Sequence, residues 1–198
     1  QQAPLGITLS LARRRELLAW AEQHERWIIE DDYLGELQLG SRAAPALASL
    51  DNHGRVIHIG TFSKTLSPAL RLGFVVVPPS LVVRFATLAA AMLPASSFVL
   101  QNAVAEFLRE GHFLRHLRRM KRIYAERLEN MLQALTPWFP DLQRGALAIV
   151  VRLPAGADDR AIARAAQSWG MAPSPLSVWY QRDDQRQAGL LLGVTNMP

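Results

Sequence analysis

The chain has 198 residues, of which 49% are hydrophobic and 20% are charged, a composition typical of a globular protein that can build a core. It contains no cysteine, which excludes disulfide bonds and thiolate zinc sites. The net charge of +5 can indicate nucleic-acid binding, but the arginines are scattered, no DNA-binding motif is recognisable, and the densest basic group, residues 115–122, lies on a segment with a strong apolar face.

The first third of the chain predicts a helix followed by three buried strands. Ser10 caps a helix over residues 10–24, whose inner side carries Leu11, Leu17, Leu18 and Ala21. Apolar runs at residues 27–29, 55–60 and 72–77 predict the strands, and the first run ends in the acids Glu30-Asp31-Asp32. A loop rich in glycine, serine, proline and alanine covers residues 35–49.

Helical spacing replaces the strand pattern after Pro78-Pro79. Residues 81–92 predict a helix that Pro94 ends, and residues 97–109 predict a second one that ends at Gly111. A long helix follows and ends before Pro137, with an apolar stripe that we interpret as core rather than as a cofactor contact. This stripe consists of Leu117, Tyr124, Leu128, Met131 and Leu135.

The last sixty residues predict a smaller unit, with strands at residues 148–153 and 190–194 and a helix over residues 158–169 that Gly170 closes. Strands alternating with helices indicate an α/β fold, with mainly parallel pairing in the first part. We predict a partial large domain at residues 1–110, and a long connecting helix with a small C-terminal α/β lobe at residues 111–198. Pro78, Pro79 and Arg84 interrupt the most apolar stretch, so no membrane span is predicted. No signal segment opens the chain, and we expect a cytoplasmic protein.

Chemistry-bearing residues follow two of the predicted strands. Lys64 comes after a strand end, where ligands of open α/β sheets bind, and a lysine partly withdrawn from water has a lowered pKa and can attack an aldehyde. Hydroxyls and a guanidinium suited to phosphate lie near it in the sequence: Thr61, Ser63 and Arg71. Asp31 and Asp32 end another strand and could hold a protonated ring nitrogen. A lone lysine–arginine pair is usually a surface feature and a doubled aspartate is often a cap, but the length of the pattern around Lys64 favours a site.

The segment Gly60-Thr61-Phe62-Ser63-Lys64, followed by Pro68, Leu70, Arg71 and Gly73, resembles the pyridoxal-phosphate (PLP) lysine segment of fold-type-I aminotransferases. Glu30-Asp31-Asp32-Tyr33 resembles, more narrowly, the MocR subgroup of GntR-type transcriptional regulators, which join a winged helix-turn-helix to an aminotransferase-like domain. The resemblance covers nearly the whole chain, and further stretches that agree are residues 45–51, 110–112, 116, 118–120 and 189–193.

This resemblance implies an aspartate aminotransferase-like fold with PLP as cofactor, and it implies a role for each matching residue. Lys64 would form the Schiff base, Asp31 would pair with the pyridine nitrogen, and Tyr33 would hydrogen-bond the ring hydroxyl. The phosphate would be bound by Thr61, Ser63 and Arg71. No metal ligand is implied.

The chain departs from the family pattern in two places. The turn Gln2-Ala3-Pro4-Leu5-Gly6 lacks the asparagine of the family. Aminotransferases also place an arginine before a late Leu-Gly or Leu-Asn step to bind the substrate carboxylate, whereas this chain has Leu191-Leu192-Gly193 and, as a possible substitute, Arg182. In the family a glycine-rich phosphate loop, a ring-stacking aromatic residue and the DNA-binding domain precede that turn, so we expect the chain to be the later part of a longer protein.

Three functions remain open at this point. The favoured one is the aminotransferase-like, PLP-binding part of a MocR-like regulator that senses an amino compound or PLP through Lys64. The alternative is a genuine amino-acid aminotransferase, and the third is a structural fragment that needs a partner chain. We expect an amino acid or amine as ligand, a homodimer, DNA binding only through an upstream domain, and weak PLP binding, no transamination and self-association by the isolated chain.

Overall fold

The computed structural model describes residues 2–39, 45–92 and 98–195. The chain divides into two compact units, one formed by residues 8–119 and the other by residues 2–7 together with residues 120–198. The division falls within one long helix. The predicted boundary between the large domain and the C-terminal part, between residues 110 and 111, is not tested by this division and stays a prediction.

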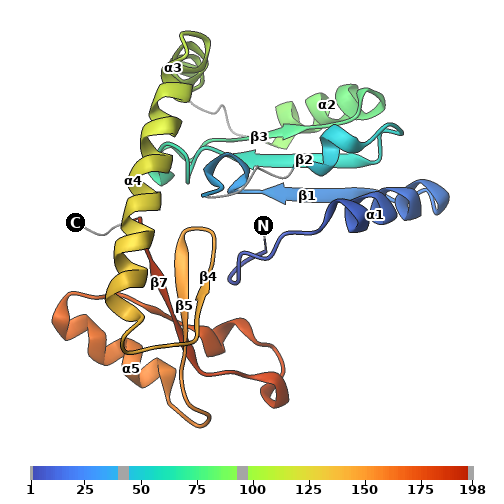
Figure 1. Cartoon of the computed structure of the whole chain (residues 1–198). Helices are drawn as coiled ribbons and strands as arrows, with labels where there is room; N and C mark the ends of the chain where they lie inside the picture. Colours follow the sequence, from blue (N-terminus) through green and yellow to red (C-terminus); the bar gives the residue numbers. More distant parts are fainter. Residues whose placement is uncertain (1, 40–44, 93–97, 196–198) are drawn as a thin grey trace. The chain divides into compact units, whose positions relative to one another are not determined.

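The first unit is built on a three-stranded sheet in the order β1-β2-β3 (Figure 1). Helix α1 (Leu11–Gln23) precedes the sheet and begins at Ser10, whose side chain accepts a hydrogen bond from the Arg13 N–H. Strands β1 (Ile28–Asp32) and β2 (Val56–Thr61) pair in parallel. Strand β3 (Gly73–Val76) pairs antiparallel with β2.

Mainly parallel pairing was predicted for the first part of the chain; β1 and β2 pair in this way, whereas β3 pairs antiparallel. The connection between β2 and β3, residues 62–72, contains only the short 3-10 turn Pro68–Leu70. A parallel return needs a longer crossover that usually contains a helix, so this connection reverses the strand direction instead.

The first sheet is only partly covered. Val56 is buried, but Ile29 is 68% exposed and Val75 is 50% exposed, so the prediction of buried strands holds for β2 better than for β1 and β3. Alternate residues of a strand face opposite sides of a sheet, and no described element covers the side of Ile29 and Val75. Leu11, predicted on the inner side of α1, is also 46% exposed, whereas Ala21 is fully buried.

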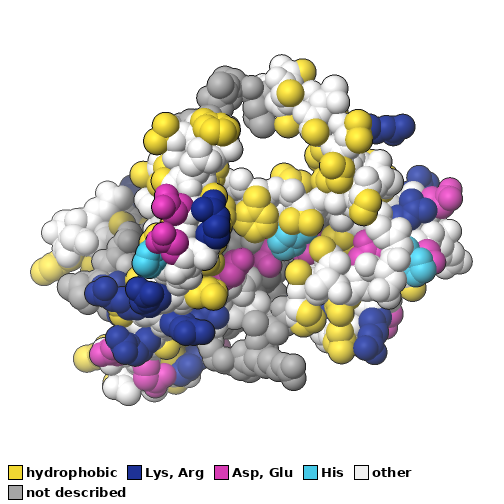
Figure 2. Space-filling model, turned by 90° about the horizontal axis from the view of Figure 1, so that it is seen from above, with side chains coloured by type: hydrophobic (Ala, Val, Ile, Leu, Met, Phe, Trp, Pro, Cys, Tyr) yellow, Lys and Arg dark blue, Asp and Glu magenta, His cyan; other side chains and the backbone are white. Residues whose placement is uncertain are grey.

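Three helices follow the sheet: α2 (Val82–Met92), α3 (Phe98–Arg109) and α4 (His112–Leu135). Helix α2 has no buried residue, α3 buries Val104, and hydrophobic side chains are visible over both helices in Figure 2. Gly111 separates α3 from α4 with a φ of +73°, a left-handed conformation that glycine adopts without strain. The predicted helix end at Pro94 lies outside the described residues.

The predicted apolar stripe of α4 is confirmed as core at Leu117 and Leu128, whereas Tyr124, Met131 and Leu135 are half-buried. Phe113 and Leu117 are buried in the first unit, and Leu128 and Leu132 are buried in the second. Charged side chains are frequent at the other positions of the helix, which is the pattern of a helix with one face on a core.

The second unit contains a four-stranded antiparallel sheet in the order β4-β5-β7-β6. Its elements are β4 (Leu142–Arg144), β5 (Ala148–Arg152), α5 (Asp159–Ala166), β6 (Ser174–Pro175) and β7 (Gly189–Gly193). The predicted small α/β lobe is present, but β4 and β6 were not predicted because strands of three and two residues leave almost no alternating pattern. Short 3-10 turns occur in both units, at Gly35–Leu37, Leu47–Leu50, Pro68–Leu70, Pro79–Leu81, Gln167–Trp169, Leu176–Trp179 and Asp183–Gln185.

The core of the second unit lies on β5 and β7. Val150, Leu176 and Leu191 form a buried cluster, and Leu5 packs against it. A buried aspartate, Asp159, ties α5 to this core by accepting hydrogen bonds from the Ser177 N–H, the Ser177 hydroxyl and the Gly189 N–H, at 2.8, 2.6 and 3.1 Å.

Within the described ranges, no helix is both long enough and apolar enough to cross a membrane. The same residues contain no group of three or more histidine and carboxylate side chains arranged to hold a metal ion.

Candidate functional site

The predicted site residues all lie at one edge of the first sheet. Strands β1 and β2 run in the same direction, with Asp32 opposite Gly60, so their carboxyl ends meet (Figure 1). Strand β3 runs the other way and begins at Gly73, opposite Thr61. The sheet register therefore places at the same edge the segments that carry Asp31 and Tyr33, Thr61 to Lys64, and Arg71.

The two faces of the sheet have different polar residues near this edge. Asp31 is in register with Ile59, two residues before Thr61, so these three side chains share one face. A strand rises about 3.3 Å per residue, which puts Thr61 about 7 Å further along the sheet than Asp31. Glu30 is in register with His58 on the opposite face.

Asp31 and Asp32 are not equivalent. The Asp32 side chain is half-buried and lies against Gly35, where its carboxylate fills the space that a Cβ would need. Asp31 is exposed, and its charge acts on Tyr33. Burial of the phenol, with the Asp31 carboxylate as a second cause, raises the pKa of Tyr33, so this side chain stays a neutral hydrogen-bond donor at neutral pH.

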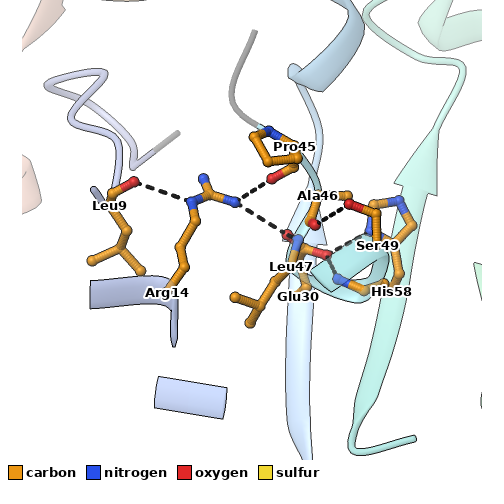
Figure 3. A network of polar contacts seen from close by, with 9 residues as sticks. Leu9, Arg14, Glu30, Pro45, Ala46, Leu47, Ser49 and His58 are labelled. Atoms are coloured by element: carbon orange, nitrogen blue, oxygen red, sulfur yellow. Dashed lines mark hydrogen bonds and ion pairs between the residues drawn. The ribbon is translucent and has the colours of Figure 1, made fainter. Parts of the chain in front are cut away.

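Behind Asp31, Glu30 connects three segments of the first unit (Figure 3). Its carboxylate accepts hydrogen bonds from the Leu47 N–H at 2.6 Å and the Ala48 N–H at 3.1 Å, and it pairs with the His58 Nδ1 at 2.9 Å. Arg14 of α1 lies on the other side of Glu30, with its guanidinium 4.0 Å from the carboxylate and 2.6 Å from the Pro45 carbonyl oxygen.

Burial opposes ionisation of Glu30, but the Leu47 N–H, the His58 imidazole and the Ala48 N–H together outweigh it, and the pKa of Glu30 is lowered. The ionised side chain fixes the end of β1 against α1, β2 and the 3-10 turn at residues 47–50. This network was not predicted, because Glu30, His58 and Arg14 are far apart in the sequence and only the strand register brings them together.

Lys64 lies in a tight turn directly after β2. The Phe62 carbonyl accepts hydrogen bonds from the Leu66 N–H at 2.8 Å and the Ser67 N–H at 3.2 Å, which closes the turn. The Ser63 N–H donates to the Thr61 Oγ1 at 3.1 Å. Lys64 itself is exposed, so its amine is accessible from solvent.

The next residue, Thr65, faces inward and is 2% exposed. Its hydroxyl oxygen is buried and has no hydrogen-bond partner among the described residues, which is uncommon for a buried polar atom in a native protein. Its carbonyl oxygen accepts a hydrogen bond from the His116 Nε2 of α4, at 2.9 Å. His116 belongs to one of the stretches that resemble the family, but the sequence analysis predicted no role for it.

Arg71 ends the 3-10 turn Pro68–Leu70 in a left-handed conformation, with φ 50° and ψ 35°. This conformation costs a residue with a Cβ about 1–2 kcal/mol, and its persistence in a non-glycine residue is a reason to look for a function. The side chain is exposed beside the start of β3.

Most polar side chains at this edge of the sheet form no hydrogen bond or ion pair with one another. Among the described residues, the Ser63 hydroxyl, the Lys64 amine and the Arg71 guanidinium have no hydrogen-bond or ion-pair partner. The Thr61 hydroxyl accepts a bond from Ser63 and keeps its own hydrogen to donate. The connection between β2 and β3 therefore offers an amine nucleophile, hydroxyl donors and a guanidinium, and the end of β1 offers a carboxylate and a phenol.

Comparison with known proteins gives consistent matches. The sequence model of a family described as aminotransferase class I and II matches residues 2–165. The chain is 40% identical over 195 residues to the probable rhizopine catabolism regulatory protein MocR of Rhizobium meliloti, covering 96% of the chain and 40% of that protein. It is 36% identical over 184 residues to the uncharacterized HTH-type transcriptional regulator YhdI of Bacillus subtilis, covering 90% of the chain and 39% of YhdI.

A similar solved structure is that of the multiple substrate aminotransferase from Thermococcus profundus, with a TM-score of 0.85 and 28% identity, covering 100% of the chain and 50% of that protein. The aminotransferase-like α/β fold predicted from the sequence is confirmed. The chain spans about two-fifths of the length of the two regulators and half of the aminotransferase, and its identity to the regulators is the higher.

Proposed function

Because the chain belongs to the aminotransferase class I and II family, whose cofactor is PLP, we propose that it forms the lysine side of a PLP site in a MocR-like regulator. The observation that carries this proposal is the shared sheet edge, which brings together the segments of Lys64, Asp31 and Arg71 and the hydroxyls of Thr61 and Ser63, each still able to donate. When bound, PLP supplies an aldehyde that condenses with amines and a ring that accepts electrons.

The residues at this edge fit such a group. A lysine amine suits an aldehyde, and a guanidinium with hydroxyl donors suits a phosphate. The buried Thr65 hydroxyl without a partner adds an unused polar atom directly after Lys64.

Each residue then has a role that its position supports. Lys64 attaches the cofactor, and Asp31 holds a proton on the ring nitrogen because it shares the face of Thr61. Tyr33, whose raised pKa keeps it protonated, donates a hydrogen bond to the ring hydroxyl. The phosphate is bound by Thr61, Ser63 and Arg71.

Two observations in the second unit favour a regulator over an ordinary aminotransferase. Leu191 stands where the resemblance expects a carboxylate-binding arginine, and it is 9% exposed in a core with Val150 and Leu176. The possible substitute, Arg182, forms a bidentate pair with Asp184 at 3.1 and 2.8 Å. A guanidinium already paired with a carboxylate is poorly suited to bind a second one.

The proposal includes the partners expected from the sequence. The ligand is an amino acid or amine that reacts at Lys64, the protein acts as a cytoplasmic homodimer, and DNA is bound through a helix-turn-helix domain outside these 198 residues. The names of the two relatives as regulators support the regulatory, DNA-binding part of this proposal.

The test uses the full-length natural protein, which is mixed with PLP and reduced with borohydride. Peptide mass spectrometry then locates the labelled lysine. Lys64 and Lys121 are the two lysines of this chain, so Lys121 serves as an internal control. We expect the label on Lys64, loss of the label in Lys64→Arg and no loss in Lys121→Arg. A label that persists in Lys64→Arg, or none in the wild type, would contradict the proposal.

A second assay separates the regulator from the aminotransferase. The same protein is incubated with PLP and each of several amino acids and amines, and both the spectral change and the release of oxo acid are measured. We expect a spectral response without catalytic turnover. Sustained transfer of amino groups to an added oxo acid would instead support the aminotransferase alternative.

A further inference from the structure

The turn that presents Lys64 is held from outside the strand by one side chain of α4. His116 donates from its Nε2 to the carbonyl oxygen of Thr65, across 51 residues of sequence and at 2.9 Å. Thr65 directly follows Lys64, so the hydrogen bond is one peptide unit away from the lysine backbone.

A second contact accompanies this hydrogen bond. The buried ring of Phe113, three residues earlier on α4, packs edge-on against the Phe62 ring, with centroids 6.2 Å apart. Phe62 supplies the carbonyl that closes the turn. Helix α4 thus contacts the turn before Lys64 through an apolar pair and after Lys64 through a hydrogen bond.

The chemistry of the acceptor fixes the proton on His116. A carbonyl oxygen can only accept, so the Nε2 carries a hydrogen whether the ring is neutral or charged. The ring is half-buried and lies edge-on to Phe107, with centroids 6.5 Å apart, which limits its rotation. The His116 Nε2–H therefore donates to the turn from a fixed position and direction.

We propose that His116 is a positioning residue for Lys64, an inference that rests on the proposed PLP function of that lysine. The Nε2–H of His116 holds the Thr65 carbonyl and thereby the backbone direction from which the Lys64 side chain leaves the turn. Without this bond, the turn can still close at Phe62 but opens more often, and it loses the contact that orients the residue after the lysine. A reacting amine displaced by a fraction of an ångström loses rate more than binding.

The chain offers a matched control on the same helix. His112 lies one turn earlier, and its ring is also near Phe107, with centroids 5.7 Å apart. It pairs at 2.9 Å with Glu110 at the surface and makes no hydrogen bond, ion pair or ring contact with the lysine turn in the described part of the chain. His112→Leu therefore removes a histidine and an aromatic contact from α4 without touching Thr65.

Different substitutions at His116 distinguish the loss of its hydrogen-bond donor from the loss of its ring volume. Leucine removes the donor. Glutamine places an amide N–H close to the position of the Nε2, whereas asparagine is shorter and cannot reach Thr65. If His116→Leu does not fold, as judged by circular dichroism, His116→Asn replaces it as the variant without the bond.

The first readout is the rate of borohydride-trapped PLP labelling of Lys64 in the longest natural form of the protein, with the PLP dissociation constant measured separately. We expect His116→Leu or His116→Asn to slow labelling about tenfold or more, the order expected for a misplaced reacting group, with a smaller change in the dissociation constant. His116→Gln should recover most of the rate, and His112→Leu should match the wild type. Wild-type rates in the leucine and asparagine variants, or no recovery with glutamine, would overturn the proposal.

The second readout needs no cofactor. In the 198-residue chain, hydrogen exchange at the Leu66 and Ser67 amides reports on the turn, because both donate to the Phe62 carbonyl. We expect faster exchange in the variants without the bond, and recovery in His116→Gln. Absence of a PLP label at Lys64 in the wild type would contradict the proposed function but not the role of His116 in the turn. Unchanged hydrogen exchange in the variants would contradict the role of His116.

Discussion

The two sheets of this protein differ in how much of their apolar surface they bury. In the second unit, Ile149 and Val150 of β5 are fully buried, and β5 is flanked by strands on both sides. In the first unit, Ile29 of β1 and Val75 of β3 are 68% and 50% exposed. The sheet that carries the candidate site thus leaves apolar side chains uncovered in the described chain, while the sheet without those residues completes a core.

The difference shows where the folding free energy of the described chain resides. Burial of apolar area contributes roughly 25 cal/mol per Å², and in the second unit the strand residues Ile149, Val150 and Val151 make this contribution directly. The first unit buries apolar side chains mainly outside its sheet, such as Leu34, Leu37 and Leu47, and polar contacts of Glu30 and of the Lys64 turn also hold its elements. Of its candidate site residues, Asp31, Lys64 and Arg71 are exposed and form no ion pair among the described residues, so they contribute little to stability.

The largest predicted effect tests this comparison with one isoleucine from each sheet. Ile149→Ala removes a fully buried side chain and should lower the free energy of unfolding of the 198-residue chain by about 3–4 kcal/mol. Ile29→Ala removes an exposed one and should cost less than about 1 kcal/mol. Urea unfolding followed by tryptophan fluorescence measures both. Similar losses would show that the first sheet is buried in solution by a contact outside the described chain.

The buried Asp159 gives the next largest effect. Asparagine at this position would direct an NH₂ group at the donors of Ser177 and Gly189 and should cost about 3 kcal/mol. Asp158→Asn is the control, because the exposed Asp158 caps α5 through the Ala161 N–H and asparagine caps helices equally well. Equal losses in the two variants would mean that the Asp159 bonds do not persist in solution.

The pH dependence of Asp159 has a definite sign. Burial opposes its ionisation, but the side chain and backbone of Ser177 and the Gly189 N–H outweigh this, and the pKa of Asp159 is lowered. The stabilisation is therefore fully present above the unfolded pKa of about 3.9 and is lost as the pH falls through the lower folded pKa. The difference in unfolding free energy between wild type and Asp159→Asn should be constant near neutral pH and shrink at more acidic pH.

Arg71 should show a smaller effect of the opposite sign. Arg71→Gly relieves a left-handed conformation and should raise the free energy of unfolding by about 1 kcal/mol, while the affinity for PLP falls because the guanidinium is lost. Glu25→Gly is a matched control, since Glu25 also has a positive φ, of 52°, and lies away from the sheet edge that carries Lys64. It should gain similar stability without any change in PLP affinity. A loss of affinity in both variants would contradict the phosphate role of Arg71.

Much of this architecture could be predicted because it is encoded locally. Ser10 marks the start of α1, Gly111 and Gly170 end helical segments in left-handed conformations, and the stripe through Leu117 and Leu128 predicts the buried face of α4. The antiparallel direction of β3 could not be predicted in this way. It depends on whether residues 62–72 form a crossover, and strand direction leaves no periodic signal in the sequence.

The site shows the same limit. The two segments around Asp31 and Lys64 are recognisable because their functional residues are adjacent in the sequence. The contacts that hold those segments are long-range: Glu30 meets His58 across 28 residues, and His116 meets Thr65 across 51. Such pairs follow from the sheet register and from helix packing, which the sequence of either partner does not reveal.

The smallest predicted effect on stability concerns the two neighbouring aspartates at the end of β1. Asp31 is exposed and forms no ion pair among the described residues, so Asp31→Ala should change the free energy of unfolding by less than about 0.5 kcal/mol. Asp32→Ala removes a half-buried carboxylate that lies against Gly35 and should cost more.

Retention of PLP should follow the reverse order, because Asp31 shares the face of Thr61 and a carboxylate beside the ring nitrogen keeps it protonated. Dialysis of the longest natural form of the protein, followed by absorbance of the retained cofactor, compares the two variants. Tyr33 provides a second readout, since the Asp31 carboxylate contributes to its raised pKa and Asp31→Ala should lower the pKa of that phenol in a spectroscopic titration. A greater loss of PLP in Asp32→Ala would assign the ring nitrogen to Asp32, and equal retention in the two variants would count against the role of Asp31.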